Sequence, residues 1–303
     1  MHDHSVTAML SDASLMRAFL AGLMLAIATA PLGVFLILRR MSLIGDAFGH
    51  AILPGAAGAA LLSGGATWAV SLGAALTGTT VFVSASFIGR LLRLPEDAGF
   101  ALFFMSALAL GVVITNAGEE HIHLDELLFG NALDLDSTAL TLCGIAMIVS
   151  VIGMRAIYRP LMIDTLDSGF LAGAGHNKPM GKSAGSFAQA GFFALLALTS
   201  VAAFHALGAL MAVGMTIIPA IGARYLARSI PIMMVSAGVL AASGVCAGLI
   251  IATIAHAPAG ASIILSLVVL AFASAILGPV GSVFSRNAWV FYKPGSNVAT
   301  SKT

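Results

Sequence analysis

Apolar runs close to the length of a membrane span follow one another along almost the whole chain. The hydrocarbon core of a bilayer is ~30 Å thick and takes about 20 residues of α-helix, whereas a spanning β-strand is about half as long. Lipid offers the backbone no hydrogen-bond partner, so runs of this length must be helical. Charged residues are only 9% of the sequence, against roughly 25% in soluble proteins. The sequence therefore predicts an all-α, polytopic membrane protein.

Polar breaks divide the chain into about nine predicted spans within a single transmembrane domain, 1–303. The run 207–223 is short and carries Pro219 near its end, so it could cross only partly, and the count is eight or nine. Arg17 is followed by an uninterrupted apolar run and no clear signal-cleavage site, so we interpret the first run as a helix. The predicted spans are 14–38, 44–62, 68–88, 98–115, 137–154, 184–203, 207–223, 231–253 and 261–285.

The basic residues predict how these spans are oriented. With the spans placed as above, every Lys and Arg except Arg17 falls on one side of the membrane. Lys and Arg accumulate in cytoplasmic loops. We therefore expect the N-terminus outside and the C-terminus, with a tail at 286–303, inside.

Asp46 and His50 are the candidate metal ligands. They lie one helical turn apart, so they share one helix face. Asp46 is the only carboxylate predicted within a span, and such a group costs about 2.5 to 3.5 kcal/mol at a span's centre, which usually marks an ion path. A carboxylate and an imidazole can bind one divalent cation. Gly45 and Gly49 form a small-x-x-x-small pair beside them, which favours close helix packing.

Two readings of this pair stay open. Two facing copies of the chain would bring together two Asp and two His side chains, enough for a four-coordinate ion. Alternatively, Asp46 caps a helix close to the basic turn at Arg39 and Arg40, while His50 packs in a polar pocket.

The remaining histidines are secondary candidates for binding metal or contacting a partner protein outside the membrane. His121 and His123 lie in the acidic exterior loop 116–136, which would raise the local cation concentration whether or not they bind metal. His205 and His256 lie in short predicted exterior turns. For all four, an ordinary loop or turn residue is the alternative. Cys143 and Cys246 lie alone within spans and are expected to be apolar packing residues.

The longest cytoplasmic connection, 156–183, could form a surface helix that a partner grips or could be a simple connector. Near its end, Gly175 and Gly181 are separated by five residues, where a phosphate-binding loop needs four, and no strand precedes them. No other catalytic motif is visible, so we predict that the chain is not an enzyme. Any ATP used for transport would be hydrolysed by another polypeptide.

Several stretches resemble the zinc/manganese permease family of ATP-binding cassette importers. The specific one is RRMSLIGDAFGHAILPG at 39–55, with its G-D-x-x-x-H block. Residues 127–136, 208–229 and 257–265 follow in the family's order. The resemblance implies a homodimer in the bacterial cytoplasmic (inner) membrane, two cytoplasmic ATPase subunits and an extracytoplasmic metal-binding protein, with lipid contacts and no nucleic acid.

By the same resemblance, Asp46 and His50 match the family's metal-coordinating pair, and residues 161–176 match the segment that couples the permease to its ATPase. Pro219 and Arg224 match a run that we interpret as structural. The coupling candidates are Leu161, Asp164, Leu166, Asp167, Phe170 and Leu171.

The sequence thus favours an importer permease for a divalent transition metal, with no permanently bound cofactor. The alternative is a secondary transporter or channel that uses the same site without ATP. Imidazole ligands, the usual affinity order and four-coordination favour Zn²⁺ over Mn²⁺. The Asp and His ligands do not distinguish iron from these two metals.

Overall fold

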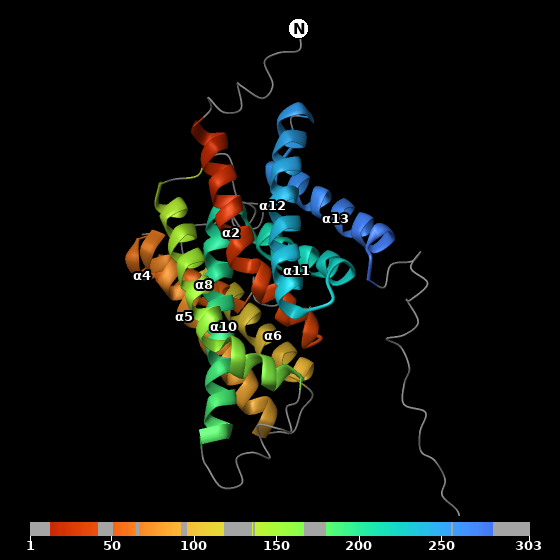
Figure 1. Ribbon diagram of the computed structural model, residues 1–303. Helices are drawn as coiled ribbons and strands as arrows, with labels where there is room; N and C mark the ends of the chain where they lie inside the picture. Colours follow the sequence, from red (N-terminus) through yellow and green to blue (C-terminus); the bar gives the residue numbers. More distant parts are fainter. Residues whose placement is uncertain are drawn as a thin grey trace, which may run out of the picture.

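The computed structural model describes residues 13–41, 51–64, 67–91, 96–117, 135, 137–166, 180–255 and 257–280, and all of its regular structure in these ranges is helical. Within these ranges, six helices are long and apolar enough to cross a membrane, and the shorter apolar stretches Gly99–Ile114 and Met211–Leu226 add to them. The prediction of an all-α polytopic membrane protein is confirmed. The helices, shown in Figure 1, are α2 (Ala13–Leu38), α4 (Leu53–Ser63), α5 (Thr67–Leu91), α6 (Glu96–Ala117), α8 (Ser137–Leu166), α10 (Met180–Leu207), α11 (Ala209–Leu226), α12 (Ile230–Ala255) and α13 (Ala259–Leu277).

Helix α8 extends well past the predicted span 137–154. It continues to Leu166 through Pro160, so the first part of the predicted connection 156–183 belongs to this helix. Figure 1 shows the last turns of α8 running at an angle to the rest of the helix. Proline is a common cause of such a bend, because it lacks an N–H and its ring displaces the preceding turn.

Helix α13 ends at Leu277, before the end of the predicted span 261–285. Gly278 is extended, with φ −61° and ψ 143°, as expected for a residue that precedes a proline. The Val280 N–H then donates to the Tyr225 carbonyl at 3.0 Å, which fixes the end of α13 beside the end of α11.

A single glycine separates α10 from α11. Gly208 has φ +86°, a conformation that other residues rarely adopt, so the chain changes direction there without a longer loop. His205, predicted to lie in the turn, instead lies in the last turn of α10. The 18 residues of α11 reach about 27 Å, close to the ~30 Å hydrocarbon core.

Helix α2 is the central element of the fold. It packs against α8, α10, α11 and α12, and its residues enter all three apolar clusters, for example Leu25, Phe35 and Val34. In its most apolar stretch 67% of the residues are buried, against 28% in α5, α8 and α13. The outer helices expose large apolar side chains such as Val235 and Phe272, which lipid can cover. Helices α4, α5 and α6 pack together, and α5 joins them to α10.

Candidate functional site

Most of the predicted site residues lie outside the described residues. This holds for the metal pair Asp46 and His50 and their neighbours Gly45 and Gly49, for His121, His123 and His256, and for Asp167, Phe170 and Leu171. Only the backbone of Leu166 is described. The structure does describe the chain on both sides of the segment 42–50, and it describes Leu161, Asp164 and His205.

The chain enters the segment 42–50 through a tight turn at the end of α2. The Met41 N–H donates to the Leu36 carbonyl at 2.9 Å, and the Arg40 N–H donates to the Ile37 carbonyl at 3.0 Å. These two bonds form the Schellman motif, whose left-handed position is usually glycine. Here Arg40 occupies it with φ +60°, at a cost of about 1 kcal/mol or more. Met41, directly after it, is 2% exposed.

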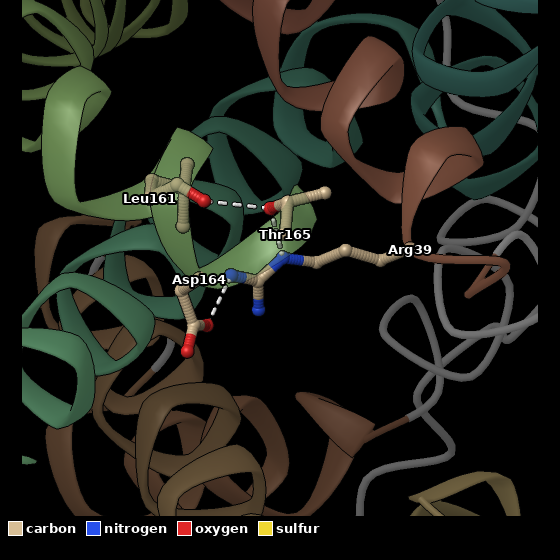
Figure 2. Close-up of polar contacts among 4 residues, drawn as sticks. All are labelled: Arg39, Leu161, Asp164 and Thr165. Atoms are coloured by element: carbon tan, nitrogen blue, oxygen red, sulfur yellow. Dashed lines mark hydrogen bonds and ion pairs between the residues drawn. The ribbon is translucent and has the colours of Figure 1, made fainter. Parts of the chain in front are cut away.

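The neighbouring Arg39 is held by α8. Its Nη2 lies 2.6 Å from Asp164 Oδ2, and its Nε donates to Thr165 Oγ1 at 3.0 Å. Figure 2 shows the Arg39 side chain reaching from the end of α2 to these two neighbours on α8. The Thr165 hydroxyl donates in turn to the Leu161 carbonyl at 2.7 Å, which fixes its orientation as an acceptor for Arg39.

Burial strengthens the attraction between the two charges and makes the loss of either partner costly. The side chains of Arg39 and Asp164 are 8% and 23% exposed. The Arg39 guanidinium carbon also lies 5.8 Å from the centre of the Phe192 ring of α10, within range of a cation–π interaction. The guanidinium therefore joins three helices at one point.

Aromatic side chains pack beside this point. Phe35 of α2 meets Tyr158 of α8 and Phe192 of α10 edge to face, with ring centres 6.1 and 6.4 Å apart. The Leu161 side chain is fully buried in the same cluster. Any role of Leu161 in coupling would therefore pass through packing inside the chain rather than through direct contact with a partner.

The chain leaves the segment 42–50 at a second fixed point. Ala51 and Ile52 are buried, and α4 then packs closely on α5. A Cβ at Gly55 would overlap the Gly73 carbonyl oxygen and Thr77 Oγ1, so only glycine permits this approach. The segment that carries Asp46 and His50 is thus anchored to α8 before it begins and to α5 after it ends.

His205 has local hydrogen-bond partners on both ring nitrogens. Nε2 lies 3.4 Å from Ser71 Oγ of α5, and Nδ1 lies 3.4 Å from the Val201 carbonyl. Within the described ranges, His, Cys, Asp and Glu side chains form no group of three that could hold a metal ion. These contacts favour a helix-packing role for His205. Cys143 is likewise fully buried in an apolar cluster, as predicted for a packing residue.

The pairing of Arg39 with Asp164 was not foreseen from the sequence. From the sequence, Arg39 belongs to the basic turn before Asp46 and Asp164 belongs to the coupling candidates, and the two are 125 residues apart in the chain. A carboxylate close to a predicted membrane surface has many possible basic partners. No local signal selects Arg39 from its neighbour Arg40, whose side chain is exposed.

Comparisons with known proteins agree with the helical architecture and the sequence pattern. The profile of the ABC 3 transport family matches residues 11–278. The manganese transport system membrane protein MntC of Halalkalibacterium halodurans is 31% identical over 92% of this chain and 92% of its own length. The chelated iron transport system membrane protein YfeD of Yersinia pestis is 29% identical over 73% of this chain and 71% of its own.

A solved structure shares the fold. PsaBC from Streptococcus pneumoniae, solved in complex with Fab, superposes with a TM-score of 0.75 at 25% sequence identity. The match covers 92% of this chain and 97% of the matched one.

Proposed function

The chain belongs to the ABC 3 transport family, and from this premise we propose that it carries manganese into the cell past Asp46 and His50. It is the multi-pass membrane permease of a bacterial ATP-binding cassette importer for a divalent metal, and ATP is hydrolysed on a separate subunit. The identity of the metal, its ligands, the remaining partners and the orientation of the chain are what we propose.

The position of the segment 42–50 between two anchored points is the observation that carries the proposed site. A metal ligand must be held in place while the metal binds and leaves, and ligands on rigid supports are positioned best. Arg39 ties the chain to α8 before the segment, and Gly55 packs on α5 after it. Asp46 and His50 lie between these supports in sequence and provide one oxygen and one nitrogen ligand.

The choice of manganese departs from the zinc preference that the ligand chemistry alone suggests. Similar proteins that include MntC are named for manganese transport, and others that include YfeD are named for chelated iron transport. Mn²⁺ accepts carboxylate, carbonyl and water oxygens together with imidazole, so a site with Asp46 and His50 can hold it when further oxygens complete the coordination. Zinc, which the affinity order favours at a fixed ligand set, is the competing cargo.

The proposed assembly is a homodimer of this chain with two cytoplasmic ATPase subunits and an extracytoplasmic metal-binding protein. The N-terminus lies outside and the C-terminus inside, because all basic residues except Arg17 then face the cytoplasm. Two copies would place two Asp46 and two His50 side chains on one path.

Transport into proteoliposomes tests the proposal. The permease is reconstituted with its ATPase subunit and delivery protein, and isotopic manganese uptake is measured with ATP, without ATP and with an imposed proton gradient. We expect uptake that requires ATP and that a tenfold excess of zinc reduces only weakly. Zinc uptake in place of manganese uptake would overturn the proposed cargo, and gradient-driven uptake without ATP would favour a secondary transporter.

A further inference from the structure

We propose that Arg39 is a positioning residue for transport, which passes movement at the end of α8 to the end of α2 and so to the segment carrying Asp46. This inference rests on the proposed function, because it assigns the path by which the ATPase acts on the metal site. Arg39 itself touches neither metal nor ATPase in this scheme.

The contacts at Arg39 are directional and link specific helices. Asp164 and Thr165, next to each other on α8, accept hydrogen bonds from two different nitrogens of the same guanidinium, at 2.6 and 3.0 Å. Figure 2 shows both partners at the tip of the Arg39 side chain, with Thr165 above the guanidinium and Asp164 below and to the left of it. A planar guanidinium held at two positions cannot rotate freely, so a shift of the last turn of α8 displaces the Arg39 backbone or breaks the pair.

Burial makes breaking the pair costly. Arg39 is only 8% exposed at its side chain, and losing one partner of a buried ion pair leaves the other charge uncompensated. The end of α2 therefore follows the end of α8 within the range that the pair can accommodate. Nearer the middle of both helices, the Ser150 hydroxyl of α8 donates to the Ala28 carbonyl of α2 at 2.8 Å, so the two helices are also joined there.

The sequence places the two proposed functional segments at the two ends of this link. Asp164 lies shortly before the remaining coupling candidates, which begin at Leu166, and Arg39 lies shortly before the segment with Asp46. The tight turn at Arg40 fixes Met41, where this segment begins, relative to Arg39, because the Met41 N–H donates to the Leu36 carbonyl. A link of this kind explains why an arginine is buried at the end of α2 while Arg40 remains exposed.

The test separates coupling from stability by neutralising the pair singly and together. Asp164→Asn, Arg39→Gln and the double variant are reconstituted with the ATPase subunit and delivery protein, and manganese uptake and ATP hydrolysis are measured in the same vesicles. Arg159→Gln is the control, because Arg159 is exposed on the same helix. Thr165→Val removes one hydrogen-bond acceptor of Arg39 and leaves both charges. It therefore replaces a charge variant in the test if that variant fails to assemble.

We expect each charge variant to keep ATP hydrolysis while manganese taken up per ATP falls between about twofold and thirtyfold, the range of single residues in coupling networks. Thr165→Val should show a smaller fall, and the control should match wild type. The double variant should regain thermal stability, because no charge is left unpaired, yet remain poorly coupled.

Wild-type uptake per ATP in the assembled variants would overturn the inference, as would a double variant whose coupling recovers together with its stability. Either result leaves the proposed function intact. The proposed function fails separately, if the wild-type transporter takes up no manganese under the same conditions.

Discussion

The Thr29 hydroxyl of α2 lies 3.4 Å from the Met215 carbonyl oxygen of α11, while it also donates to the Leu25 carbonyl at 2.8 Å. Met215 is four residues before Pro219, which has no N–H, so this carbonyl lacks its usual partner within the helix. A Cβ at Gly33, one turn along α2, would overlap the Thr216 carbonyl. The two helices therefore meet where the proline leaves backbone oxygen available.

The first prediction concerns this crossing. Thr29→Val keeps the shape of the side chain but removes the hydroxyl, whose single proton is shared between the Leu25 and Met215 carbonyls, so the buried Met215 carbonyl loses its share of that hydrogen bond. We expect the free energy of unfolding to fall by about 0.5 to 1.5 kcal/mol, measured by denaturant titration in detergent. In a Pro219→Ala background the helix can satisfy this carbonyl itself, and Thr29→Val should then cost less. Equal costs in both backgrounds would contradict the explanation.

The second prediction compares three glycines in the α4–α5 region. Gly73→Ala places a methyl against the Gly55 carbonyl and Ala59, and Gly55→Ala places one against the Gly73 carbonyl. Each should destabilise the protein by about 1 to 3 kcal/mol through overpacking. Among the described residues, none comes close to a Cβ placed at Gly58 of α4, so Gly58→Ala should be neutral or stabilise by up to about 1 kcal/mol. Melting temperatures of the purified variants give the comparison, and equal losses at Gly58 and Gly55 would refute it.

The third prediction concerns the proposed metal ligands. Asp46→Ala and His50→Ala should each abolish manganese uptake while the protein remains inserted and assembled, because each removes a ligand and Asp46→Ala also removes a charge that is costly in a membrane. His205→Gln is the matched histidine variant, and it should retain uptake because Ser71 and Val201 already occupy its ring nitrogens. Wild-type uptake by either ligand variant would show that the metal is held elsewhere.

The fourth prediction concerns the contact with the ATPase. Leu166, Phe170 and Leu171 are proposed to enter a groove of the ATPase, so Asp or Arg at any of them should release the subunit or uncouple its hydrolysis from uptake. A cysteine at Phe170 should crosslink to the ATPase and not to the extracytoplasmic metal-binding protein. The reverse crosslinking pattern would overturn both the contact and the proposed orientation.

The sequence by itself determined the helical membrane architecture and most helix positions. A backbone in lipid must satisfy its hydrogen bonds within each segment, so a span can be recognised from its own residues. Errors fell at helix ends. The predicted span 137–154 ends before Leu166, because charged and proline residues interrupt the apolar run, whereas α8 continues through Pro160. The Gly278–Pro279 pair ends α13 inside the predicted span 261–285, because the residue before a proline disfavours the helical conformation.

Only the tertiary structure decided which residues meet between helices. Lipid-facing and protein-facing sides are both apolar here, so the pattern of apolar residues does not fix how each helix is rotated. For this reason the space available for a side chain differs between Gly55 and Gly58, which lie on one helix, only because of the residues that face them. For the same reason Arg39, rather than the adjacent Arg40, is buried against Asp164.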